Sequence, residues 1–250
     1  MKIGIAGYGY VGKAIAESMK HKYEVMINDP ALGHKASLKE VQALIVCVST
    51  PRSSAGYCVM DNVYQVIEKA SNEIPILIKS TISLEGWRML KDTFPEKEIS
   101  FSPEFLTAAN ATQDFANTQQ VLLGGDNTHF WSGFFVDLLG TIDVKIANPE
   151  DLVLAKYARN SYLALKVTYF NQLKDVCEKA GVDFEQVRKY VADDSRIGYS
   201  HTNVTKERGY GGHCLPKDVD AFLHQAKGYN TELSLLEEAV KYNSKIRNEN

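Results

Sequence analysis

The sequence of 250 residues contains no apolar run that approaches 18 residues, so it offers no segment to cross a membrane as a helix. It opens on a strand-like segment in place of the charged and apolar regions of a secretion signal. The formal net charge of −3 gives no overall attraction to nucleic acid or to an anionic membrane. We therefore expect a soluble cytoplasmic protein that acts on neither nucleic acid nor membranes.

The four cysteines lack CxxC or any other ligand-like spacing, which argues against a zinc site and against a disulfide framework. They are Cys47, Cys58, Cys177 and Cys214. Cys47 lies in the apolar run ALIVCV and Cys177 lies in a helical pattern, so both are predicted to be small buried hydrophobes. Cys58, in a Gly/Ser loop, is assigned no role. We expect no metal site and at least one working thiol.

The first part of the chain alternates short β-rich runs with helical patterns. Strands are expected at 2–6, 24–28, 43–48, 76–79, 98–101, 119–125 and 142–146, with helices at 12–20 and 61–70. Strands that alternate with helices predict a parallel sheet with right-handed crossovers.

A long helix is expected after this region. Asn148 is a good N-cap, Pro149 suits the first helical position, and acidic residues follow in the first turn. No breaker occurs before Gly181, which gives a helix of about 30 residues, well above the average. A loop over 195–212 and helices near 216–227 and 231–248 complete the pattern. We expect one domain over 1–147 and a second, helical domain over 148–250.

The segment GYGYVG at positions 7–12 is a GxGxxG run that follows a predicted strand and opens a predicted helix. Its first glycine permits a tight turn, its second lets a pyrophosphate approach the backbone, and its third lets helix pack on strand. The predicted cofactor contacts here are Gly7, Gly9, Tyr10, Val11 and Gly12. The fold class we expect is α/β, with a Rossmann-like doubly wound parallel sheet, then the long helix and a small all-α domain.

Asp29 ends the second predicted strand, 17 residues after Gly12. A carboxylate there accepts hydrogen bonds from both ribose hydroxyls and repels a 2′-phosphate. The neighbours Pro30 and Ala31 supply no arginine for such a phosphate. The expected cofactor is therefore NAD.

The ten residues GYGGHCLPKD at 209–218 resemble the GxGGxCxPKD signature of the UDP-glucose/GDP-mannose dehydrogenase family. Other family-like segments follow in the expected order: CVSTP at 47–51, KST at 79–81, SPEFL at 102–106, KYARN at 156–160, Phe170-Asn171 and RIG at 196–198. The resemblance covers essentially the whole chain. It implies an NAD-dependent enzyme that oxidises the C6 alcohol of a nucleotide sugar twice, first to the aldehyde and then to the acid.

The cysteine of this signature suits covalent catalysis. A free cysteine has a pKa near 8.5, so only a few per cent is thiolate at neutral pH. Because Pro216 is a natural first-turn residue, we expect Cys214 near a helix N-terminus, whose dipole favours the anion. Asp218 lies one turn further along the same helix face, where it can orient or deprotonate a water. The resemblance implies that Cys214 captures the aldehyde as a thiohemiacetal and carries the thioester that water hydrolyses.

The resemblance also implies roles for residues elsewhere in the chain. Lys156 and Asn160 are four residues apart on one helix face and are expected to stabilise an oxyanion and hold water. Glu104 is expected to be a general base or to orient water, with Thr81 bonded to the same water. Further cofactor contacts are expected at Val48, Ser49, Thr50, Thr81 and Lys217. Substrate contacts are expected at Phe105, Leu106, Lys156, Asn160, Arg208 and Gly211, with Lys206 as a second phosphate partner.

The sequence departs from the family pattern at three places. After SPEFL it has Thr107 and Ala108 where a glutamate is frequent, and Gln119-Gln120 replaces a frequent arginine. The loop at 200–208 is longer and more polar than usual. Family enzymes also continue into a third, nucleotide-binding domain, so this chain is expected to be either a natural minimal form or a shortened one.

Two other functions remain open at this point. A 3-hydroxyacid dehydrogenase also joins a Rossmann domain to helices and uses a Lys/Asn helix pair, but it requires neither Cys214 nor Asp218. A cofactor-binding remnant without activity is the other alternative. The expected partners are a UDP-sugar substrate and a second copy of the chain, paired through the long helix. The identity of the sugar is left open.

Overall fold

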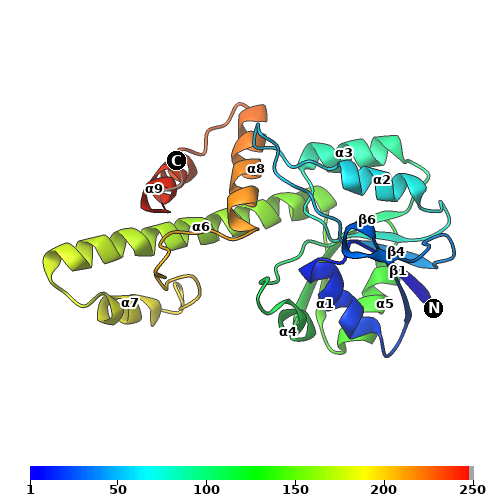
Figure 1. Cartoon of the computed structure of the whole chain (residues 1–250), viewed down its shortest axis with the longest axis horizontal. Helices are drawn as coiled ribbons and strands as arrows, with labels where there is room; N and C mark the ends of the chain where they lie inside the picture. Colours follow the sequence, from blue (N-terminus) through cyan, green and yellow to red (C-terminus); the bar gives the residue numbers. More distant parts are fainter. Residues whose placement is uncertain (248–250) are drawn as a thin grey trace. The chain divides into compact units, whose positions relative to one another are not determined.

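The computed structural model describes residues 1–247, which fall into two compact units (Figure 1). The first unit comprises residues 1–53 and 58–156, and the second comprises residues 54–57 together with the chain from residue 157 onward. Each unit has its own apolar core. Within residues 1–247, no helix is both long enough and apolar enough to cross a membrane.

The described part of the first unit holds one sheet of eight strands. They are β1 (Lys2–Ala6), β2 (Glu24–Asp29), β3 (His34–Lys35), β4 (Ala43–Val46), β5 (Ile76–Ile78), β6 (Ile99–Phe101), β7 (Gln120–Gly125) and β8 (Asp143–Ile146). Their spatial order is β3-β2-β1-β4-β5-β6-β7-β8. All neighbours are parallel except β3 against β2 and β7 against β6. The order reverses direction between β1 and β4, which makes the carboxyl ends of these two strands the usual place for a ligand.

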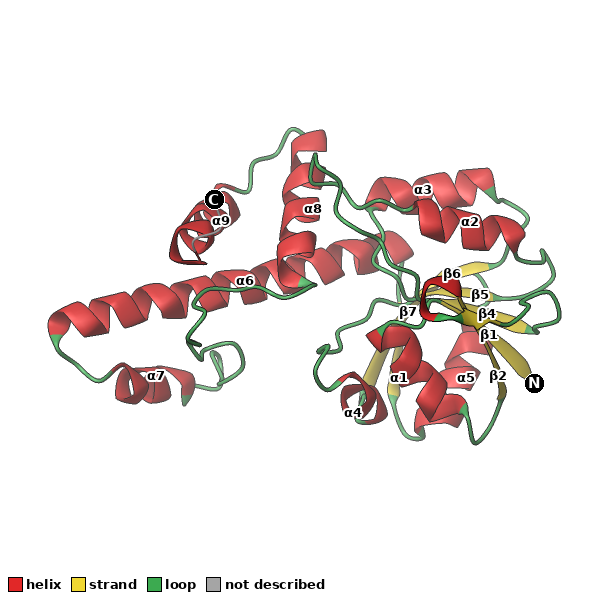
Figure 2. Cartoon of the chain, viewed as in Figure 1, coloured by secondary structure: helices red, strands yellow, loops and turns green. Residues whose placement is uncertain are grey.

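The central strands β4 and β5 are apolar along their whole length because helices cover both faces of the sheet. Ile5 pairs with Ile27 on one side and Ile45 on the other, and Ile5 and Ile45 are fully buried. The covering helices are α1 (Tyr10–Met19), α2 (Asp61–Lys69), α3 (Leu84–Thr93), α4 (Ala111–Ala116) and α5 (Thr128–Leu139). Figure 2 shows α2 and α3 on one face and α1, α4 and α5 on the other. The predicted Rossmann-like α/β class is confirmed.

The boundaries differ from the expected ones where local signals are weak. Helix α1 begins at Tyr10, two residues earlier than predicted, and β4 ends at Val46, two residues earlier. Helices α3, α4 and α5 were not predicted from the sequence. Helix α5 is apolar nearly all round and therefore shows little helical periodicity. The antiparallel β7 also departs from an all-parallel sheet.

The long helix is present as predicted. Helix α6 (Pro149–Ala180) has 32 residues, and Asn148 Oδ1 accepts a hydrogen bond from the Glu150 amide at 3.0 Å. Gly181, with φ of +69°, ends the helix in the left-handed conformation that glycine adopts without strain. The helix begins in the first unit and continues as the main element of the second.

Three further helices complete the described part of the second unit: α7 (Phe184–Ala192), α8 (Leu215–Gly228) and α9 (Ser234–Arg247). Helix α7 was not predicted. Helix α9 begins three residues later than expected, and its predicted end at residue 248 lies outside the described residues. Ala164 of α6, Tyr210, Val219 of α8 and Leu236 of α9 form one core between α6, α8 and α9, and Phe170, Cys177 and Phe184 form a second between α6 and α7.

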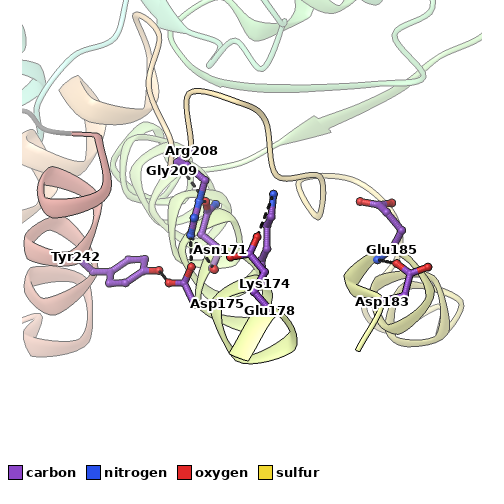
Figure 3. Close-up of polar contacts among 9 residues, drawn as sticks. All are labelled: Asn171, Lys174, Asp175, Glu178, Asp183, Glu185, Arg208, Gly209 and Tyr242. Carbon is purple, nitrogen blue, oxygen red and sulfur yellow. Dashed lines mark hydrogen bonds and ion pairs between the residues drawn. The ribbon is translucent and has the colours of Figure 1, made fainter. Parts of the chain in front are cut away.

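A polar network joins α6, the loop before α8 and α9 (Figure 3). Arg208 donates to Asp175 at 2.6 Å, and the Tyr242 hydroxyl donates to the other oxygen of the same carboxylate. Burial opposes ionisation of Asp175, but the hydrogen bonds from Tyr242 and Arg208 outweigh it, so the pKa of this carboxyl is lowered. Burial and the bond to Asp175 raise the pKa of Tyr242 to about 12. The network therefore stays ionised at Asp175 and neutral at Tyr242 at physiological pH.

Candidate functional site

The glycine turn after β1 is shaped for a phosphate. Gly7 has φ of +91°, and a Cβ on it would lie 2.5 Å from the Cys47 carbonyl oxygen. A Cβ on Gly12 would lie 2.1 Å from the Gly7 carbonyl oxygen, so helix α1 approaches the turn as closely as the sequence predicted. Gly9, by contrast, faces open space and is the N-cap of α1 without a side-chain cap. The N-terminal end of α1, where the helix dipole is positive, is thus open to an anionic ligand.

A cleft of about 780 Å³ adjoins this turn. Four of the predicted cofactor residues line it: Gly7, Asp29, Val48 and Ser49. Asp29 accepts the Tyr8 amide at 2.7 Å through Oδ2 and the Leu32 amide at 3.3 Å through Oδ1. A carboxylate has about four acceptor positions, so Asp29 retains capacity for ribose hydroxyls. Steric room at Gly9 and the acid at the cleft wall fit a dinucleotide.

The cleft also has lining residues that were not predicted from the sequence. Lys35, Lys39, Asn62 and Lys69 belong to it. Asn62 donates to the Ser49 carbonyl at 3.0 Å, which holds the loop after β4 against α2. No motif marks these residues, because they enter the cleft from β3, the loop after it and α2. Thr50, a predicted cofactor contact, is buried and is not among the lining residues.

A buried ion pair lies at the carboxyl ends of β5 and β6. Lys79 Nζ is 2.9 Å from Glu104 Oε2, and the two side chains are 4% and 12% exposed. Lys79 also donates to Ser102 Oγ at 3.1 Å. Two charges can remain in such a place only when they compensate one another. Lys79 belongs to the family-like segment KST, but the sequence analysis gives it no role. The feature that could have indicated one is its position, because a lysine directly after a buried strand needs a partner for its charge.

Lys156, in the first turns of α6, completes this cluster. Its ammonium group donates to the Glu104 carbonyl oxygen at 2.5 Å and lies 5.6 Å from the centre of the Phe105 ring. The Glu104 carboxylate accepts the Phe105 amide at 2.8 Å. The structure therefore brings together Glu104, Phe105 and Lys156, three of the predicted site residues.

The other residues near this cluster that the sequence analysis named lie in different environments. Thr81 lies three residues past the end of β5, and its carbonyl is 3.5 Å from the Cys58 thiol. Cys58 lies outside the helices and strands, in the loop where the sequence placed it, and its side chain is buried. Cys47 is only partly buried and packs at the edge of the core, whereas a buried residue was predicted. Desolvation raises the pKa of its thiol to about 12, with Lys79 opposing and Glu104 adding to the shift, so the thiol stays neutral. Leu106 packs against the core of the first unit.

In the second unit, Cys214 is the N-cap residue of α8 and Pro216 lies in the first turn, as predicted. The Asp218 amide donates to the Cys214 carbonyl at 2.9 Å, which closes the first helical turn. Cys214 is partly exposed. The thiol-bearing residue is thus held at the N-terminal end of α8, which is the positive end of the helix dipole.

Asp218 is 1% exposed and carries two hydrogen bonds from side chains. Asn160 Nδ2 donates to Oδ2 at 2.6 Å, and Lys217 Nζ donates to Oδ1 at 2.6 Å. Lys156 and Asn160 share one face of α6, but Lys156 contacts Glu104 whereas Asn160 contacts Asp218. Lys217, predicted to contact the cofactor, is paired with Asp218.

The predicted phosphate contacts of the second unit lie in the loop before α8. Arg208 donates to the Asn171 side chain at 2.9 Å and to Asp175, so its charge is balanced within the unit. Gly211 lies against Arg247, because a Cβ on it would be 2.8 Å from the guanidinium carbon. Lys206 is exposed. Residues 1–247 contain no group of three or more His, Cys, Asp or Glu side chains arranged to hold a metal ion.

The fold of the first unit, the glycine turn after β1 and the cleft beside it together define a dinucleotide-binding protein of the Rossmann class. Residues 31–132 match the family model for the NAD-binding domain of UDP-glucose/GDP-mannose dehydrogenases, and residues 153–245 match the model for their central domain. The chain therefore belongs to the UDP-glucose/GDP-mannose dehydrogenase family, and its first unit is an NAD-binding domain.

Individual relatives agree with this assignment. The chain is 31% identical over 227 residues to a UDP-glucose 6-dehydrogenase of Rickettsia bellii, an alignment that covers 84% of this chain and 51% of the relative. A UDP-glucose 6-dehydrogenase of Rhizobium meliloti is 25% identical, with 97% of this chain and 67% of the relative covered. The chain thus spans about half the length of the Rickettsia relative.

The fold resembles solved structures over nearly all of its length. A UDP-glucose dehydrogenase from Pyrobaculum islandicum superposes with a TM-score of 0.85 at 21% identity, covering 98% of this chain and 68% of that one. A GDP-mannose dehydrogenase from Pseudomonas aeruginosa gives a TM-score of 0.68 at 21% identity, covering 98% and 69%. At these identities the likeness establishes the fold.

The substitution Gly9→Ala should weaken cofactor binding without changing the stability of the fold. The added methyl group meets no atom within 4 Å, so we expect an unchanged melting temperature. It would occupy the space a pyrophosphate needs, and affinity for NAD should fall at least about tenfold, or roughly 1.4 kcal/mol. Isothermal titration with NAD measures this, with Gly133→Ala in α5 as the control, since that position is also open. Unchanged affinity in Gly9→Ala would contradict the assignment of the turn.

The Lys79 and Glu104 pair predicts a non-additive double mutant. Lys79→Met leaves a buried carboxylate without its partner and should lower the free energy of unfolding by about 3–5 kcal/mol. Adding Glu104→Gln removes that charge, so we expect the double variant to be more stable than Lys79→Met alone. Urea unfolding measures the cycle.

Lys145→Met is the matched control, because Lys145 pairs with Asp143 at an exposed position and should lose less than about 1 kcal/mol. If the double variant loses as much unfolding free energy as Lys79→Met and Glu104→Gln lose together, the two charges do not compensate each other as described.

Proposed function

We propose that the chain oxidises the C6 alcohol of a nucleotide sugar to the carboxylate in two steps, converting UDP-glucose to UDP-glucuronate. The observation that carries this proposal is the buried Asp218 carboxylate, held by Asn160 and Lys217 one turn after Cys214 at the start of α8. An oxidation that stops at the aldehyde requires no thiol. A partly exposed cysteine at a helix N-terminus, with a fixed carboxylate one turn further along the helix, supports an acyl intermediate and its hydrolysis.

NAD, when bound in the first unit, supplies the hydride acceptor for each oxidation. In the first, the alcohol loses a proton and a hydride to become the aldehyde. The Cys214 sulfur then adds to the aldehyde carbon, and the oxygen gains a proton to give a thiohemiacetal. Loss of a second hydride and a proton leaves a thioester on Cys214. Water attacks this carbonyl carbon, the carbon–sulfur bond breaks, and the acid and the free thiol result.

The other residues take roles that their surroundings support. Lys156 is a fixed ammonium group suited to a developing oxyanion. Glu104, kept in place by Lys79 and the Phe105 amide, is proposed to orient or deprotonate water, with Thr81 bonded to that water. Asp218 is proposed to act on the water that attacks the thioester. Phe105, Leu106, Arg208 and Gly211 remain proposed substrate contacts.

The yield of NADH per sugar tests the proposal. With a panel of UDP- and GDP-sugars and excess NAD, we expect two NADH per UDP-glucose, measured by absorbance against the sugar consumed. One NADH would indicate a single-step hydroxyacid type of dehydrogenase, and none would indicate a cofactor-binding chain without activity. Either result would overturn the proposed function.

Cys214→Ala tests the covalent step. We expect two-step turnover to fall at least about a thousandfold while NAD affinity stays unchanged, because the thiol belongs to the second unit and the cleft to the first. Cys177→Ala removes a buried thiol of the same unit and should keep the yield of two NADH. Full two-step turnover by Cys214→Ala would exclude the thioester.

We also propose that the chain forms a homodimer through α6. Tyr162, Tyr169 and Val176 are about 60% exposed, and their seven-residue spacing places them along one stripe of the helix. An apolar stripe of this kind is stabilised when a second helix covers it. Contact between two copies of α6 would bury it on both.

Tyr169→Arg places a charge at the middle of this stripe and should convert a dimer into a monomer, as read by light scattering behind size exclusion. Tyr190→Arg on α7 is the control, because Tyr190 is also exposed but lies off the stripe. A monomeric unsubstituted chain, or a dimer unaffected by Tyr169→Arg, would contradict this interface.

A further inference from the structure

The backbone that leads into Cys214 has an unusual conformation. Arg208 and Gly209 are consecutive residues with φ of +60° and +57°, and Gly212 has φ of +78°. A non-glycine residue in this region is uncommon, and it persists only where the surroundings hold it there. Two side chains from helices on either side of the loop supply that constraint.

The first is Asn171 of α6, which is 1% exposed. Its Oδ1 accepts two hydrogen bonds, from Arg208 Nε at 2.9 Å and from the Gly209 amide at 3.0 Å. Its Nδ2 donates to the Val167 carbonyl one turn back at 2.9 Å. The contacts to the loop, drawn in Figure 3, therefore use only the acceptor end of this amide.

The second is Asn243 of α9, which is 5% exposed. Its Oδ1 accepts the Tyr210 amide at 2.7 Å, and its Nδ2 donates to the Tyr210 carbonyl at 3.0 Å. Both backbone groups of one buried residue are thus paired with one side chain, as a neighbouring strand would pair them. Arg247 of the same helix donates to the Arg208 carbonyl at 3.0 Å.

We propose that Asn171 and Asn243, here called the asparagine clamp, are positioning residues for Cys214. They touch three successive residues, Arg208 to Tyr210, and fix the path from which the chain enters α8 at its N-cap. The role rests on the proposed function, because positioning matters only if the Cys214 sulfur meets a sugar carbon. The clamp itself is a property of the loop and can be observed without turnover.

The two asparagines make different demands on a substitution. Asn171→Asp keeps the acceptor that Arg208 and Gly209 use, and the arginine compensates the added charge. It loses the donor to the Val167 carbonyl, but that carbonyl keeps the helical hydrogen bond from the amide of residue 171 within α6. Asn243→Asp places a second carboxylate oxygen against the Tyr210 carbonyl, two acceptors without a proton between them. The clamp therefore predicts that aspartate is tolerated at 171 and rejected at 243, whereas leucine is rejected at both.

Hydrogen exchange read by mass spectrometry tests the clamp in the full chain. In peptides covering 207–215, which include the Cys214 amide, Asn243→Asp, Asn243→Leu and Asn171→Leu should exchange at least roughly a hundredfold faster than the unsubstituted chain. Asn171→Asp should stay within about threefold of it. Peptides from the rest of the second unit should be unchanged. Lys241→Leu, an exposed change on α9, is the control.

Steady-state kinetics on the same variants test the consequence for Cys214. We expect kcat for NADH formation to fall at least about tenfold in the three rejected variants, with KM for NAD unchanged and Asn171→Asp restoring turnover. Exchange like that of the unsubstituted chain in Asn243→Asp, or fast exchange with full kcat, would overturn the proposal. If the unsubstituted chain forms no NADH, the proposed function fails, while the exchange rates still decide whether the clamp fixes the approach to Cys214.

Discussion

The buried carboxylate of Asp218 is the constraint on which the second unit depends. A carboxylate that is 1% exposed is tolerated only with compensating partners, and here an amide from α6 and the neighbouring lysine supply them. Meeting that requirement ties α8 to α6 at one point of each helix. Because Asp218 is one turn into α8, the same contact fixes the helix end where Cys214 lies.

The first unit contains a comparable arrangement at the ends of its strands. Lys79 and Glu104 compensate each other in a place that water does not reach freely, and Lys156 bonds to the Glu104 backbone. Each unit thus holds a carboxylate and an ammonium group in fixed positions through partners that are buried or only partly exposed. Fixed charges of this kind do not have to reorganise during a reaction, which is the main advantage a protein site has over water.

The sequence allowed the nucleotide turn and the long helix to be predicted because their signals are local. Three glycines follow a strand at set spacing, Asp29 ends the next strand, and Asn148-Pro149 opens a helix that Gly181 closes. A feature that depends on a few neighbouring residues can be predicted from the sequence, because the interactions that cause it involve only those residues.

The partners of the charged residues could not be predicted in the same way. The four-residue spacing of Lys156 and Asn160 shows that they share a helix face, but not that one contacts Glu104 and the other Asp218. Arg208 was expected to face a phosphate, and only the folded chain brings it to Asp175, 33 positions earlier. The roles of Lys79 and Asn243 likewise depend on contacts between distant segments. Helix α5 was not predicted because its own residues are apolar on nearly all sides, so the sequence shows little helical periodicity there.

The most direct test of the account is to trap the acyl group on Cys214. The chain, or its Asp218→Asn variant in which hydrolysis should be slow, is mixed with NAD and UDP-glucose, quenched in acid, digested and examined by mass spectrometry. The account predicts that the peptide carrying Cys214 gains the mass of the oxidised nucleotide sugar, and that the gain accumulates in Asp218→Asn. Formation of two NADH per sugar with Cys214 unmodified in both proteins, or an adduct on another cysteine, would contradict it.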